Sequence, residues 1–64
     1  MAQPSKQAHN LYVMLSATGA SPEEIRYTLK NIKPSVVKSI AEDILNLPYN
    51  SNEEAIDLIS FNLK

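Results

Sequence analysis

The feature that most constrains this chain is a stretch, residues 19–45, that reads as two helices joined by a very short turn. Ser21 is a good N-cap, Pro22 suits the first helical position, and Glu24 follows the cap by three residues. Pro34 disfavours a helical conformation at the residue before it and suits the start of a second helix. A short helix, a brief turn and a longer helix that share one core form a helix-turn-helix.

Apolar residues in this stretch recur at the spacing of a helix face. The first helix places them at Ile25, Leu29 and Ile32, four and three residues apart. The second helix has a longer apolar face, formed by Val36, Val37, Ile40, Ala41, Ile44 and Leu47. Because the chain gives no strand signal, we predict an all-α fold.

Two further helices are predicted outside this stretch. Ser5 can cap a helix that runs to about Ala17, and Gly19 fits the left-handed position that ends it. Ser51, with Glu54 three residues later, caps a last helix. The predicted fold is one compact four-helix domain containing a helix-turn-helix, with helices near residues 5–17, 21–32, 34–47 and 52–63 and a disordered tail at 1–4. The predicted core contains Leu11, Leu15, Ile25, Leu29, Val37, Ile40, Ile44 and Ile59.

Composition excludes several classes of protein. The 64 residues suffice for one domain and include no cysteine, one histidine and one glycine. Catalytic, metal and phosphate-binding sites need more of these residues, so we expect no enzyme activity, catalytic residue, metal, cofactor or small-molecule substrate. No segment approaches the length of a membrane span, and the N-terminus lacks the apolar region of a signal peptide. We therefore expect a cytoplasmic protein with no membrane contact.

Charge is unevenly distributed, although the net charge is only −1. Basic residues follow one another without an acidic residue between them from Arg26 to Lys38, and every charged residue after Lys38 is acidic until Lys64. The candidate DNA-binding residues are Arg26, Lys30, Lys33, Ser35, Lys38 and Ser39. The first three are expected to neutralise phosphates and the last three to approach phosphates or base edges. A solvated polar face on a small helical bundle is the alternative, and Glu42 favours it.

The last predicted helix is apolar on more than one side. Ile56 belongs to one apolar row, whereas Leu58 and Phe61 lie off that row. A surface helix of a small domain needs only one apolar face. Either the first helix or a partner is therefore expected to cover the additional apolar side chains. We predict a homodimer, or contact with a partner protein, through Ile56, Leu58 and Phe61.

Residues 11–60 resemble the LuxR/GerE-type helix-turn-helix of bacterial transcription regulators. The matching residues, in family order, are Ala17-Thr18-Gly19, Ser21, Glu24-Ile25, Leu29, Val37-Lys38, Ile44-Leu45, Ser51 and Glu54-Ala55-Ile56. The turn near Asn31 is one residue longer than in that family, the linker at 46–50 is one residue shorter, and Ile40 replaces a residue that is often polar. The resemblance implies a small DNA-binding transcriptional regulator whose recognition helix lies near 34–47.

Other readings share parts of this pattern. Residues 19–25 are similar to the opening of Cro/repressor-type helix-turn-helix domains. A ubiquitin-associated-like three-helix module shares the spacing of Ile25, Leu29, Val36 and Ile40. The main functional alternative is a non-enzymatic protein-interaction module of the same shape: an adaptor, an anti-activator or an oligomerising domain. The acidic half, the lack of arginine on the third helix and the apolar last helix favour that alternative. The resemblance favours DNA, and so does the exposed basic row of Arg26, Lys30 and Lys33, which are spaced four and three residues apart.

Overall fold

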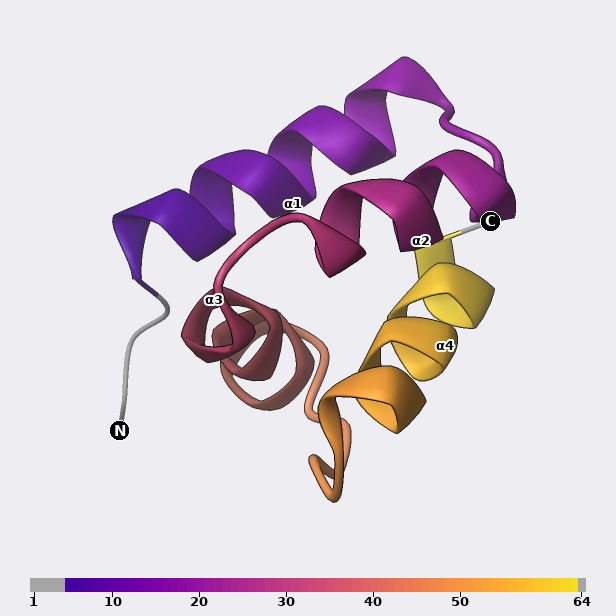
Figure 1. The fold of residues 1–64 in the computed structure, drawn as a ribbon. Helices are drawn as coiled ribbons and strands as arrows, with labels where there is room; N and C mark the ends of the chain where they lie inside the picture. The colour runs from indigo at the N-terminus through magenta and orange to yellow at the C-terminus, as the bar shows by residue number, and fades with distance from the viewer. Residues whose placement is uncertain (1–4, 64) are drawn as a thin grey trace.

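The computed structural model describes residues 5–63. Its elements are α1 (Lys6–Thr18), α2 (Pro22–Lys30), α3 (Pro34–Ser39), the π-helical η1 (Ile40–Ile44) and α4 (Asn52–Leu63). Because η1 continues α3 directly, the described residues form four helices and no strand, as predicted (Figure 1). The tail predicted at 1–4 lies outside the described residues.

Serine caps and a left-handed glycine set the ends of the first two helices. Ser5 Oγ accepts a hydrogen bond from the Ala8 N–H at 3.1 Å, and Gly19 follows α1 with a φ of 65°. Ser21 Oγ accepts from the Glu24 N–H, and Glu24 Oε1 accepts from the Ser21 N–H, each at 3.2 Å. These bonds satisfy N–H groups that a helix start leaves without helical partners, so the predicted caps are confirmed.

The third helix ends earlier than predicted because it widens and the chain then reverses. Its last turns, Ile40–Ile44, are π-helical. Asn46 adopts a left-handed φ of 54°, and the Leu47 N–H returns to the Ala41 carbonyl at 2.7 Å. A left-handed residue of this kind is a common helix terminator. The helix therefore stops at Ile44 rather than at residue 47.

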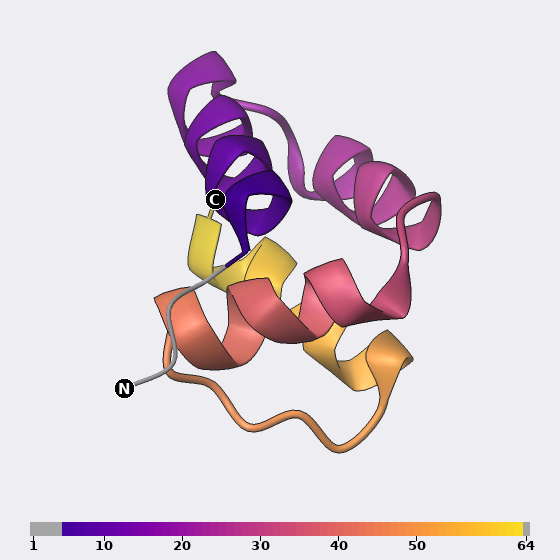
Figure 2. The same cartoon turned by 90° about the vertical axis from the view of Figure 1, so that its left-hand side faces the viewer.

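The third helix lies at the centre of the fold. Both α1 and α4 contact α3 and η1, whereas α2 packs mainly on α4. Figure 2 shows α3 and η1 crossing the molecule, with the linker 45–51 returning beside them to the start of α4. The helix-turn-helix is thus supported by α1 on one side and by α4 on another.

The core combines residues from all four helices. Six of the eight predicted core residues are buried: Leu15, Ile25, Leu29, Val37, Ile40 and Ile59. Leu11 and Ile44 are only half-buried, and both pack on the margin of this cluster. The prediction left out five other buried apolar residues, Ala8, Val36, Ala41, Ala55 and Ile56. Buried Ser60 fits among them because its hydroxyl donates to the Ile56 carbonyl at 2.8 Å.

Candidate nucleic-acid interface

The turn between α2 and α3 is closed by local hydrogen bonds. The Asn31 N–H donates to the Thr28 carbonyl at 3.1 Å, and its Nδ2 donates to a second carbonyl of α2 at 2.7 Å. Lys33 is extended, with a ψ of 138°, as the following Pro34 requires. As a result α2 ends at Lys30, two residues before the predicted end at 32.

Residues 30–38, which we call the basic segment, carry three exposed lysines. Lys30 ends α2, Lys33 is the N-cap of α3, and Lys38 lies in the last turn of α3. None of the three forms an ion pair within residues 5–63. Their positive charges are therefore available to an anionic partner.

The two serines predicted to accompany Lys38 have different surroundings. Ser35 is exposed in the first turn of α3. Ser39 is half-buried; its Oγ accepts from the Ser5 N–H and donates to Asp43 Oδ2, each at 3.2 Å. Ser39 thus links the start of α1 to η1. Its expected contact with base edges requires these bonds to break, so Ser35 is the better candidate.

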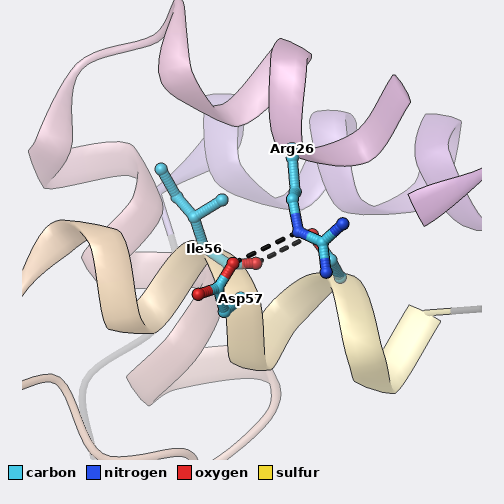
Figure 3. A network of polar contacts seen from close by, with 4 residues as sticks. Arg26, Ile56 and Asp57 are labelled. Carbon is cyan, nitrogen blue, oxygen red and sulfur yellow. Dashed lines mark hydrogen bonds and ion pairs between the residues drawn. The ribbon is translucent and has the colours of Figure 1, made fainter. Parts of the chain in front are cut away.

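Arg26 was predicted to lie in one exposed row with Lys30 and Lys33. Its side chain instead reaches α4. Its Nε–H donates to Asp57 Oδ1 at 3.2 Å, forming an ion pair between α2 and α4 (Figure 3). The two side chains are 43% and 66% exposed, so the pair lies at the surface. Asp57 already binds Arg26 in this conformation, so the predicted contact of Arg26 with phosphate competes with this ion pair.

Lys38 has a neighbour that the sequence analysis did not identify. Its Nζ lies over the ring of Tyr49, 5.9 Å from the centroid. The half-buried Tyr49 packs against the core, and its hydroxyl donates to Asn52 Oδ1 at 3.0 Å. Through Tyr49, the linker after the third helix therefore contacts Lys38, the lysine that is predicted to approach the bases.

Acidic residues occupy the second half of the same helix. Glu42 and Asp43 are both exposed in η1. The third helix is consequently basic where it begins and acidic where it ends. An anionic partner is attracted by its first half and repelled by its second.

The predicted partner interface on α4 is partly wrong. Ile56 is 2% exposed and belongs to the core, because α4 turns the two pairs Ala55–Ile56 and Ile59–Ser60 inward. Leu58 is half-buried, and Phe61 is 65% exposed. Of the three predicted residues, Phe61 alone presents a large apolar surface to solvent.

No family model, characterised protein or solved structure matches this chain. The functional reading therefore depends on its own geometry and on the sequence resemblance. Within residues 5–63, no three His, Asp or Glu side chains are grouped as a metal site requires. In that same range no helix combines the length and apolar character needed to cross a bilayer.

Proposed function

We propose that the protein is a small transcriptional regulator that binds duplex DNA through the basic segment. The observation that carries the proposal is the cluster of exposed lysines at the turn and in α3, none of them ion-paired within residues 5–63. In DNA-bound helix-turn-helix domains, the N-terminal residues of the recognition helix approach the base edges. In this chain the recognition helix is α3 continued by η1, and its first half contains Ser35 and Lys38.

The structure changes the roles proposed for individual residues. Lys30 and Lys33 contact phosphates, whereas Ser35 and Lys38 approach phosphates or base edges in the major groove. Arg26 and Ser39 join only after they leave Asp57 and Asp43 respectively. Glu42 lies beyond the basic half, where it is tolerated if it accepts a bond from a cytosine amino group.

So few phosphate contacts imply weak, salt-sensitive binding. Each neutralised phosphate contributes about 0.9 to the slope of log affinity against log salt. Three lysines therefore give a slope of about −3 for one protomer. Useful specificity requires two protomers on neighbouring half-sites, which is why the proposal includes a homodimer. A cytoplasmic location is part of this proposal.

Duplex titrations at several salt concentrations test the proposal. Lys30→Ala should weaken binding to all sequences equally and reduce the slope by about one unit, because it removes one phosphate contact. Lys38→Ala should also change which sequence is preferred. Lys6→Ala is the matched control, since Lys6 is exposed at the start of α1, outside the basic segment. Absence of binding at low salt, or equal effects of all three substitutions, would reject the proposal.

A protein-interaction module is the second candidate function. Large apolar side chains are exposed on three helices: Val13 and Met14 on α1, Tyr27 on α2 and Phe61 on α4. Aromatic residues are enriched at protein interfaces, and the acidic end of the third helix disfavours DNA. Under this candidate, the basic segment would contact an acidic surface of a partner protein.

A further inference from the structure

We propose that Tyr49 is a positioning residue of the DNA interface, which holds Lys38 in the orientation that discriminates between base sequences. This inference rests on the proposed function. It starts from the 5.9 Å separation between the Lys38 Nζ and the centroid of the Tyr49 ring. An ammonium group within about 6 Å of a ring centroid is attracted by the ring quadrupole.

The ring of Tyr49 is itself held in place from two sides. It packs against the hydrophobic core, and its hydroxyl donates to Asn52 Oδ1, at the first residue of α4, at 3.0 Å. Both contacts connect the linker to the body of the protein. The ring is therefore a fixed platform, whereas Lys38 is exposed and has four rotatable side-chain bonds.

Holding a lysine in one place affects specificity and general affinity differently. Attraction to phosphate depends mainly on the charge, which Lys38 retains in any rotamer. Recognition of a base edge depends on where the ammonium group lies. A side chain that is ordered before binding also loses less entropy when it binds. Removing the ring should therefore reduce sequence discrimination while leaving the salt slope unchanged.

Substitutions at Tyr49 and at Lys38 should therefore have different effects on DNA binding. Lys38→Ala removes both the charge and its position, so it should lower the salt slope and the discrimination together. Tyr49→Leu keeps an apolar side chain against the core but has no aromatic face. Tyr49→Phe keeps the ring and its packing against the core and loses only the hydroxyl that bonds to Asn52, so it is the matched control.

The experiment begins with a duplex that the wild type selects from a randomised pool, compared with a scrambled duplex of the same composition. Tyr49→Leu should reduce the ratio of the two affinities by about two- to fivefold, with an unchanged salt slope. Tyr49→Phe should keep the wild-type ratio. If Tyr49→Leu retains the full ratio, the inference is overturned and the proposed function survives. If the wild type binds both duplexes equally, the inference is overturned and only sequence-independent DNA binding survives. If the wild type binds neither duplex, both are overturned.

A second test uses the wild type without DNA, so it does not require Tyr49→Leu to fold. A methylene group held over an aromatic ring has an upfield-shifted proton resonance. The Lys38 ε-methylene should show this shift without DNA, and Tyr49→Phe should preserve it. Random-coil values for Lys38 in the wild type would overturn the inference, whatever the behaviour of the leucine variant.

Discussion

At the scale of single residues, the contact between Arg26 and Asp57 bears most directly on the proposed function. Both side chains are substantially exposed, and ion pairs of this kind contribute about 0–1 kcal/mol to stability. The pair therefore stabilises the packing of α2 on α4 only slightly. Under the proposed function, the pair also competes with phosphate for a guanidinium group beside the basic segment.

Replacing Asp57 should release that cation. We expect Asp57→Asn to strengthen duplex binding and to make the salt slope steeper by about 0.9, because Arg26 becomes available for one more phosphate contact. Titration against duplex DNA at several salt concentrations measures both effects. Glu53→Gln is the control, since it removes an exposed carboxylate from the same helix and leaves Arg26 paired. Equal effects of the two variants would show that net charge alone is responsible.

Leu29 provides a test of the core. It is fully buried, and truncation to alanine leaves a cavity that a small domain fills poorly. We expect Leu29→Ala to lower the free energy of unfolding by about 2–5 kcal/mol, measured by urea denaturation. Met14→Ala, at a half-exposed position of α1, should change it by less than about 1 kcal/mol. Similar losses from both variants would contradict the assigned core.

Single residues also show what the sequence could and could not predict. Leu29 and Ile25 were identifiable because burial follows the 3.6-residue period of their own helix. The long-range partners of Arg26 and Ser39, Asp57 and Ser5, were not predicted because they lie 31 and 34 residues away. Contacts over such separations depend on how helices pack, which local periodicity does not encode. The Lys38–Tyr49 contact was missed for the same reason.

At the scale of elements, helix starts were more predictable than helix ends. The starts of α2 and α4 depend on short local motifs, Ser21 with Glu24 and Ser51 with Glu54. The end of the third helix depends on η1, in which an extra residue widens the turn. Periodicity over 3.6 residues assumes a regular helix, so it extended this element to residue 47.

Asn46 allows a direct test of that helix end. Its φ of 54° is tolerated by asparagine and glycine but strains a β-branched residue. We expect Asn46→Gly to be nearly neutral and Asn46→Val to cost about 1–2 kcal/mol of unfolding free energy, measured by thermal denaturation. If valine were as stable as glycine at this position, the left-handed helix end would be wrong.

At the scale of the whole molecule, the exposed aromatic surface bears on association. Phe61 is the exposed member of the predicted α4 interface, and burying it against a second copy would remove a large apolar surface from water. We predict that the wild type sediments as a homodimer in a concentration-dependent manner. Phe61→Ser should shift the equilibrium toward monomer, whereas Tyr27→Ser, at another exposed aromatic residue on α2, should not. A wild type that is monomeric at all concentrations would remove this prediction.

The central claim is that the basic segment is the surface that meets duplex DNA. Backbone amide shifts of the full chain, recorded by NMR at low salt while duplex DNA is added, test that claim most directly. We predict that the largest changes occur within residues 30–38 and at Tyr49, with little change at Val13 on the exposed side of α1. Absence of change, or changes confined to α4 around Phe61, would contradict it.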